Sequence, residues 1–178
     1  MDKILVTGNN GSVGRTLTRL FDQKNIKWVG TDGYDLTERM DTKALFVKNP
    51  NISQVVHLAS VQNSDPAVFS KNTRMVENIL EFMQSYLVKR RLLFLSSNTV
   101  YGNLSYINRK YNVDRLNKIS EEAVETDVTI PTSNYGASKL ACENLIRVAT
   151  LQNKIESVIL RSSAIVGPET RFGAFKDL

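Results

Sequence analysis

The chain has 178 residues, of which 42% are hydrophobic and 23% charged, as expected for one ordinary globular domain. The net charge of +5 is modest and is not gathered in one block, which argues against a nucleic-acid-binding protein. The single cysteine, Cys142, excludes an intrachain disulfide and suits a reducing cytoplasm, and no apolar run reaches the roughly 20 residues of a membrane span. We therefore expect a cytoplasmic protein without nucleic-acid or membrane partners.

The first predicted elements are a buried strand at residues 3–7, a glycine-rich turn and an amphipathic helix. The turn spaces Gly8, Gly11 and Gly14 as G-x-x-G-x-x-G. Gly8 would permit the tight turn, Gly11 the approach of a pyrophosphate, and Gly14 close packing of the helix, whose N-terminus attracts anions. A plain tight turn is the alternative, but the flanking strand and helix favour a cofactor site. The expected cofactor-binding residues of the turn are Gly8, Asn10, Gly11, Ser12, Val13 and Gly14, and the buried helix positions are Val13, Leu17, Leu20 and Phe21.

A second strand is expected at residues 27–31, with Asp32 at its end. An acidic residue about 20 positions past such glycines is where a ribose 2′-hydroxyl is held. It also repels a 2′-phosphate, so Asp32 favours NAD over NADP, although it would also suit a plain turn. Arg15 is the opposing signal, because its guanidinium could bind that phosphate. Asp35 and Leu36 are expected against the adenine.

The middle of the chain alternates helices with strands. Leu58, Ala59 and Ser60 follow an apolar strand and are expected to contact the cofactor. His57, the one histidine, is interpreted as a buried strand-end residue rather than a catalytic one. Asn72 lies among apolar residues of a long helix and needs a hydrogen-bonding partner. The expected elements are a helix at 38–48, a strand at 55–59, a helix from Asp65 to about Tyr86 and a fully buried strand at 92–95.

Ser96 and Ser97 end the strand at 92–95. Hydroxyls at the carboxyl end of a central parallel strand point into the crevice where ligands bind, although serines there also cap turns. The polar, irregular residues 103–130 predict a long active-site loop. A further helix follows, capped by Thr132 or Ser133.

The further helix carries Tyr135-Gly136-Ala137-Ser138-Lys139 at its head. Residues four apart share one helix face, so Tyr135 and Lys139 are expected to lie together. A nearby ammonium lowers the pKa of a phenol, which could then give and take protons near neutral pH. A buried ring beside a surface lysine is the alternative. The last strand is expected at residues 157–160.

This alternation predicts an α/β fold: a Rossmann-type, doubly wound parallel sheet in three layers, α/β/α. Residues 1–178 are expected to form one NAD(P)-binding domain.

Together these motifs resemble the extended short-chain dehydrogenase/reductases, in particular the nucleotide-sugar epimerase/dehydratase group. The resemblance implies that Tyr135 is the acid/base on a sugar oxygen, that Lys139 holds the nicotinamide ribose and lowers the tyrosine pKa, and that Ser97 and Asn72 complete the site. The stretches that match, in family order, are Thr7 to Gly14, Asp32, His57 to Ala59, Asn72, Ser96 to Gly102, Tyr135 to Lys139, Arg161 and Val166 to Pro168.

The resemblance also narrows the reaction. Dehydratases of this family carry Thr-Asp-Glu where this chain has Ser97-Asn98-Thr99. Without the two carboxylates, an NAD(P)-dependent nucleotide-sugar epimerase or 4-keto-sugar reductase is expected. A non-catalytic NAD(P)-binding module, acting as a sensor or scaffold, and a reductase of non-sugar ketones remain alternatives.

Two departures from the family concern the extent of the chain. Residues 103–118 look like an insertion, and family members usually continue well beyond Pro168, so the substrate domain of the family is expected to be missing. By analogy with the family we expect a homodimer that packs through the outer faces of residues 72–86 and 136–152.

Overall fold

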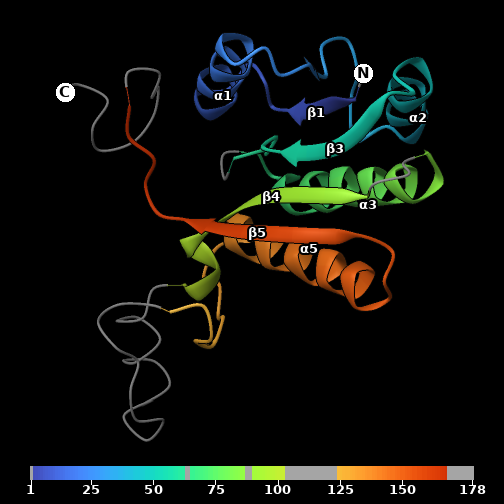
Figure 1. The fold of residues 1–178 in the computed structure, drawn as a ribbon. Coiled ribbons are helices and arrows are strands. Elements are labelled where there is room, and N and C mark those ends of the chain that lie inside the picture. The colour runs from blue at the N-terminus through green and yellow to red at the C-terminus, as the bar shows by residue number, and fades with distance from the viewer. Residues whose placement is uncertain (1, 63–64, 87–89, 103–123, 168–178) are drawn as a thin grey trace, which may run out of the picture.

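A computed structural model describes residues 2–62, 65–86, 90–102 and 124–167. The predicted insertion at residues 103–118 lies outside these described residues. Within them, five parallel strands form one sheet in the order β2-β1-β3-β4-β5. In chain order the elements are β1 (Lys3–Thr7), α1 (Ser12–Gln23), β2 (Trp28–Val29), α2 (Arg39–Lys48), β3 (Ile52–His57), α3 (Val68–Tyr86), β4 (Arg91–Ser97), the 3₁₀ helix η1 (Asn98–Tyr101), α5 (Asn134–Leu151) and β5 (Glu156–Ser162) (Figure 1).

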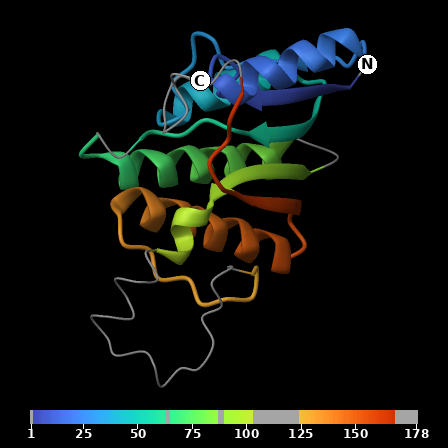
Figure 2. The same cartoon turned by 90° about the vertical axis from the view of Figure 1, so that its left-hand side faces the viewer.

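The strand order places the helices in two layers. The crossover from β1 to β2 runs in the opposite direction to those from β3 to β4 and from β4 to β5. Because such crossovers are right-handed, α1 lies on the opposite face of the sheet from α3 and α5. Helix α3 packs beside α5, and α2 packs on α3 through Phe46 and Phe82, whose ring centroids are 6.2 Å apart. Figure 2 shows the same arrangement turned by 90°. The three-layer, doubly wound fold is confirmed.

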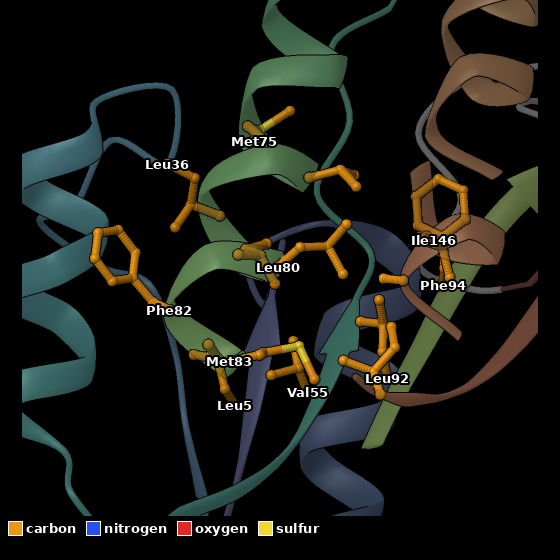
Figure 3. Close-up of a cluster of buried hydrophobic side chains, with 14 of the residues drawn as sticks. Leu5, Leu36, Val55, Met75, Leu80, Phe82, Met83, Leu92, Phe94 and Ile146 are labelled. Atoms are coloured by element: carbon orange, nitrogen blue, oxygen red, sulfur yellow. The ribbon is translucent and has the colours of Figure 1, made fainter. Parts of the chain in front are cut away.

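The main core lies between the sheet and α3 (Figure 3). Parallel pairing places Leu5 beside Val55 and Val55 beside Leu92, so the three side chains form one row on the same face of the sheet. Each is at most 3% exposed. Burying a side chain of this size contributes about 1.5–3 kcal/mol. The helices complete the core with Met75, Leu80, Phe82, Met83 and Ile146.

Several predicted details were wrong on the opposite face of the sheet. Leu20 of α1 is 44% exposed rather than buried, and β4 is fully buried only at alternate positions. The reason is that α1 is the one described helix on this face, and it packs near β1. The outer side chains of β5, Val158 and Leu160, are accordingly 54% and 45% exposed.

Two smaller differences concern the ends of elements. β2 has two residues instead of five, and α3 begins at Val68, after a turn in which Asp65 accepts a hydrogen bond from the Ala67 backbone N–H. Ser133 is the N-cap of α5, as one of the two expected alternatives. In the described part of the chain, no helix is both long and apolar enough to cross a lipid bilayer.

Candidate active site

The glycine-rich turn between β1 and α1 depends on close backbone approach. Gly8 has φ +67°, and a Cβ there would lie 2.7 Å from the Ala59 backbone nitrogen. A Cβ on Gly14 would lie 2.1 Å from the Gly8 carbonyl oxygen. A side chain at either position would separate α1 from the strand ends, which matches the roles predicted for both glycines.

The N-terminus of α1 opens into this turn. Its N-cap is Gly11, which supplies no side-chain hydrogen bond to the first N–H groups of the helix. Unsatisfied N–H groups together with the helix dipole make such an end attractive to anions. The turn therefore has the physical properties of a phosphate site.

A cleft of about 620 Å³ runs from this turn across the carboxyl ends of β3, β4 and β5 to the head of α5. It brings together predicted residues that lie far apart in the chain, from Gly8 to Lys139. The predicted site residues that line it are Gly8, Asn10, Gly11, Ser12, Val13, Gly14, Leu58, Ala59, Ser60, Ser97, Tyr135 and Lys139.

A second, more open hollow of about 630 Å³ contains the remaining predicted cofactor residues, Asp32, Asp35 and Leu36. It shares Gly8 and Asn10 with the first cleft. The two hollows therefore form one trough that bends over the glycine-rich turn, as an extended ligand with two ends would need.

Asp32 is held in place by two amides of the turn. Asn9 Nδ2 donates to one carboxylate oxygen at 2.9 Å and Asn10 Nδ2 to the other at 2.5 Å. Asn9 also accepts a hydrogen bond from the Thr31 N–H at 3.1 Å. A Cβ on Gly30 would lie 2.8 Å from the Asn9 amide, so Gly30 makes room for it. Sequence patterns did not single out Asn9, because its role depends on the fold bringing two strand ends together.

Tyr135 and Lys139 both line the cleft, at the head of α5. Lys139 is 3% exposed, and its Nζ donates to the Leu95 carbonyl oxygen at 2.8 Å. The same Nζ lies 4.8 Å from the centroid of the Phe94 ring and 5.7 Å from that of Tyr135. Burial lowers the pKa of Lys139 to about 8, below the usual lysine value, and the group remains mostly an ammonium at neutral pH.

The expected lowering of the Tyr135 pKa was wrong for this state of the protein. Burial of the ring raises the pKa of Tyr135, and a side-chain hydrogen bond with Ser60 acts in the opposite direction. The ammonium of Lys139 is engaged by a backbone carbonyl instead. Ser60, expected only as a cofactor contact, is thus also a partner of the tyrosine.

Ser97 caps the turn after β4 and also lines the cleft, while its contact with a sugar oxygen stays a prediction. It is the N-cap of η1, and its Oγ accepts hydrogen bonds from the Thr99 N–H at 3.2 Å and the Thr99 hydroxyl at 3.0 Å. It also lines the cleft. The start of α5 is pressed against this turn, since a Cβ on Gly136 would lie 2.5 Å from the Thr99 carbonyl oxygen. The glycine next to Tyr135 therefore allows the tyrosine to approach the end of β4.

Asn72 has the partners that its burial requires. Its Oδ1 accepts from the Val61 N–H at 2.8 Å, and its Nδ2 donates to the Val61 carbonyl at 3.2 Å and to Ser138 Oγ at 3.0 Å. Asn72 thereby ties the loop after β3 to the helix that carries Tyr135. Asn72 is not among the residues that line the cleft, and its part in a reaction stays a prediction.

His57 is a buried strand-end residue, as interpreted, and is not among the residues that line the cleft. Thr7 Oγ1 accepts from the N–H groups of Leu58 and Ala59 at 3.1 Å each and lies 2.7 Å from His57 Nδ1. The hydroxyl proton is therefore left to donate to Nδ1, which assigns the proton of the neutral ring to Nε2. Burial and the charge of Lys139 lower the pKa of His57 to about 3.

Two further observations bear on the chemistry. Among the described residues, no three His, Cys, Asp or Glu side chains are grouped as metal ligands.

Glu143, one turn after Lys139 on α5, is completely buried and forms an ion pair with Arg161. Sequence patterns did not reveal this pair. The available signal was the four-residue spacing from Lys139, which places Glu143 on the same helix face.

The fold and this site define a Rossmann-type α/β protein with a tyrosine–lysine pair beside a glycine-rich turn. The model of the NAD dependent epimerase/dehydratase family matches residues 4–177. The chain therefore belongs to this family.

Solved structures with the same fold include sugar-nucleotide enzymes. The UDP-glucose 4-epimerase of Thermus thermophilus, in complex with NAD, superposes with a TM-score of 0.79 at 22% identity over 98% of this chain and 59% of its own. RMD from Pseudomonas aeruginosa, complexed with NADPH, has a TM-score of 0.75 at 23% identity over 95% and 56%. A short-chain dehydrogenase/reductase superfamily protein from Agrobacterium tumefaciens with bound NAD has a TM-score of 0.73 at 26% identity over 89% and 48%.

Two curated relatives are named only as uncharacterized proteins. PB2B2.11 of Schizosaccharomyces pombe is 27% identical over 184 residues, which cover 94% of this chain and 46% of that protein. YtbQ of Bacillus subtilis is 24% identical over 182 residues, which cover 95% and 70%. The chain thus spans about half the length of the first relative and of the solved structures.

Proposed function

We propose that these residues are the cofactor-binding and catalytic part of an NAD(P)-dependent nucleotide-sugar epimerase or 4-keto-sugar reductase. The observation that carries this proposal is the single trough in which the glycine-rich turn, Asp32 and the pair Tyr135 and Lys139 face one another. Neither the glycine-rich turn alone nor the tyrosine–lysine pair alone would support both cofactor binding and catalysis.

The residues present fit a dinucleotide. The open N-terminus of α1, approached through Gly8 and Gly11, would hold the pyrophosphate. Asp32 would accept hydrogen bonds from the adenosine ribose, and its charge favours NAD over NADP. Asp35 and Leu36 would lie beside the adenine. The nicotinamide would then lie in the first cleft, near Lys139.

The chemistry proposed for the other end of the trough is proton transfer. A dinucleotide held in the trough would supply hydride transfer to and from the sugar carbon. Tyr135 would take the proton from the sugar hydroxyl during oxidation and return it during reduction. Lys139 would leave the Leu95 carbonyl for the nicotinamide ribose, and its ammonium would then favour the phenolate. Ser97 would hydrogen-bond the same sugar oxygen.

Epimerisation or keto-sugar reduction is favoured over dehydration. Asn98 and Thr99 occupy the positions after Ser97, so that turn supplies no carboxylic acid and carboxylate for the removal of water. The proposed substrate class is supported by family membership and is consistent with the epimerases that share the fold.

The direct test is incubation of the protein with NAD or NADH and a panel of UDP-, GDP- and dTDP-sugars, followed by product analysis. The wild type should turn over at least one sugar. Tyr135→Phe should reduce turnover by at least about 10³-fold. The dissociation constant of the cofactor should stay within about threefold of the wild-type value. Unchanged turnover in this variant would refute the role of Tyr135.

A non-catalytic dinucleotide-binding module is the second candidate. The observation that favours it is that burial raises the pKa of Tyr135 while the Lys139 ammonium donates to the Leu95 carbonyl rather than assisting the phenol. Tight NAD binding without turnover of any sugar in the panel would support the module and argue against the enzyme.

A homodimer through the outer faces of α3 and α5 is also proposed. Exposed apolar side chains within residues 72–86 and 136–152 include Tyr86 at 43%, Val148 at 53% and Leu151 at 82%. Sedimentation of the wild type and of Leu151→Glu would test this interface, and a wild-type monomer at all concentrations would exclude it.

A further inference from the structure

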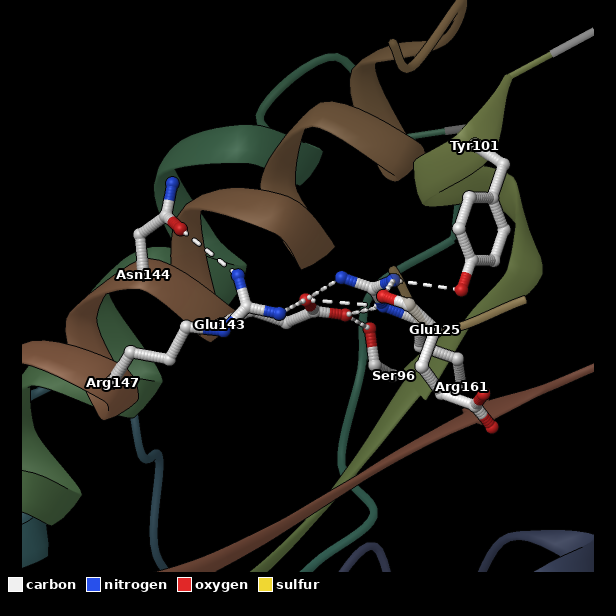
Figure 4. Close-up of polar contacts among 7 residues, drawn as sticks. All are labelled: Ser96, Tyr101, Glu125, Glu143, Asn144, Arg147 and Arg161. Carbon is white, nitrogen blue, oxygen red and sulfur yellow. Dashed lines mark hydrogen bonds and ion pairs between the residues drawn. The ribbon is translucent and has the colours of Figure 1, made fainter. Parts of the chain in front are cut away.

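A cluster of charged side chains is buried beside the cleft, between α5, β4 and β5 (Figure 4). The carboxylate of Glu143 is fully buried and accepts hydrogen bonds from Ser96 Oγ at 2.6 Å and from Arg161 and Arg147 at 2.8 Å each. Figure 4 shows it between the two guanidinium groups. Burial disfavours its charge, but the hydrogen bonds from Arg161 and Ser96 outweigh this and keep the pKa of Glu143 below its usual value.

Arg161 extends the cluster to the turn that follows β4. Its side chain is 10% exposed, and its Nη1 donates to the Tyr101 hydroxyl at 2.7 Å and to the Glu125 carbonyl at 3.2 Å. The guanidinium also lies 4.8 Å from the centroid of the Tyr101 ring. Glu143 and Arg161 thus connect α5, β5, the end of β4 and η1.

Stability alone does not account for such a cluster. The desolvation of two buried charges offsets most of their attraction, and apolar replacements of a buried pair are often neutral or stabilising. A geometric role is therefore the better explanation, particularly because Ser96 is the direct neighbour of Ser97.

Two polar contacts join α5 to β4, one helical turn apart. Lys139 donates to the carbonyl of Leu95, and Ser96 donates to Glu143. The first contact opens onto the cleft, whereas Glu143 is not among the residues that line it. If Lys139 turns toward a bound cofactor, the first contact is lost and the second remains.

We propose that Glu143 and Arg161 form a positioning pair. The pair keeps the carboxyl end of β4, and with it Ser97, in register with the helix of Tyr135 while Lys139 changes its partner. This inference rests on the proposed function, because only a reacting site requires Ser97 and Tyr135 to stay in place during that exchange.

The test is the double variant Glu143→Met/Arg161→Met, which replaces the pair by apolar side chains of similar length. The variant should melt within a few degrees of the wild type and bind NAD within about threefold. Turnover should fall about 10²-fold, as expected for a misplacement on the order of 1 Å. Hydrogen exchange of the amides at residues 98–102 should be at least about tenfold faster, while that of β1 stays unchanged.

The matched control is Arg91→Met/Glu156→Met. This exposed ion pair, with a 2.8 Å contact, joins the same two strands β4 and β5 at their opposite end. It should leave both turnover and exchange at residues 98–102 as in the wild type. Wild-type turnover and exchange in the buried double variant would overturn the proposal.

The proposal can still be tested if the double variant does not fold or if the wild type shows no turnover. If the double variant does not fold, Tyr101→Phe removes one contact of Arg161 and should still speed exchange at residues 98–102; unchanged exchange there overturns the proposal. If the wild type turns over no sugar, the proposed function fails, but the exchange comparison still decides whether the pair positions the end of β4.

Discussion

The two halves of the sheet are stabilised differently. The β1 and β3 half is covered by α1 on one face and by α3 on the other, and its central side chains Leu5, Val6 and Val55 are at most 1% exposed. The β4 and β5 half has its described helix, α5, on one face, and Val158 and Leu160 remain exposed on the other. This half combines its apolar core on the α5 side with buried polar contacts around Glu143.

The comparison shows that the two halves of the sheet keep their site residues in place by different interactions. The cofactor half depends on backbone contact and tight packing, so it should tolerate no added volume. The half that carries Ser97 and Tyr135 depends on directed polar contacts, which can be altered without unfolding the protein. Substitutions in the two halves should therefore differ in both the size and the kind of their effect.

Gly14→Ala should have the largest effect. The added Cβ would lie 2.1 Å from the Gly8 carbonyl oxygen, and neither backbone segment can yield without separating α1 from β1. We expect a loss of about 3 kcal/mol or more in the free energy of unfolding, together with loss of NAD binding. Urea denaturation and NAD titration measure both. Gly167→Ala, where a Cβ meets nothing within 4 Å, is the control and should be neutral.

The buried His57 should make the cofactor half sensitive to acid. Its pKa is about 3 in the folded protein against 6.5 in the unfolded chain. The stability from keeping the ring neutral is thus complete above pH 6.5 and is lost as the pH falls toward 3. At about 1.4 kcal/mol per pH unit the loss amounts to several kcal/mol.

The variant His57→Asn isolates this effect, because an amide oxygen can still accept the Thr7 hydroxyl but does not titrate. Unfolding free energies measured from about pH 7 to pH 4 should fall more steeply for the wild type than for the variant. Parallel curves would show that His57 is not the acid-sensitive group.

Ile159→Ala and Leu160→Ala compare the two faces of β5 at neighbouring positions. Ile159 packs against the core, whereas Leu160 is 45% exposed. We expect a loss of about 1–2 kcal/mol for Ile159→Ala and less than about 0.5 kcal/mol for Leu160→Ala. Equal losses in urea denaturation would mean that something covers the outer face of β5 in solution.

Asp32→Ala should have a selective effect on cofactor affinity. Removing the carboxylate removes both a ribose acceptor and a repulsive charge, so NAD binding should weaken about tenfold or more, while NADP binding changes little. Calorimetric titration with the two cofactors measures the ratio. Equal losses would undo the preference for NAD. Gln54→Ala, at a distance from the trough, serves as the matched control.

Much of the site could be read from local patterns. Glycine spacing after a short strand predicted the turn at Gly8 and Gly14, and the spacing of Tyr135 and Lys139 predicted that they share a helix face. The sheet then brought both to one cleft, because parallel strands deliver their carboxyl ends to the same edge.

Other features could not be read because they depend on partners distant in the chain. The pKa of Tyr135 was misjudged because Lys139 is engaged by the Leu95 carbonyl and because partial burial of the ring raises the pKa of its hydroxyl. The exposure of Leu20 was missed because the spacing of apolar residues along a helix identifies a face but not what covers it.

The sequence by itself therefore determined the element types, the parallel α/β class and the glycine-rich turn and tyrosine–lysine pair of the trough, since these follow from periodicity and from backbone sterics acting over a few residues. The tertiary structure alone decided the lowered pKa values of His57 and Lys139, the hydrogen bond from Asn9 to Asp32 and the pairing of Glu143 with Arg161. Burial and charge pairing arise from groups that meet only after folding, so their strengths are set by packing rather than by local sequence.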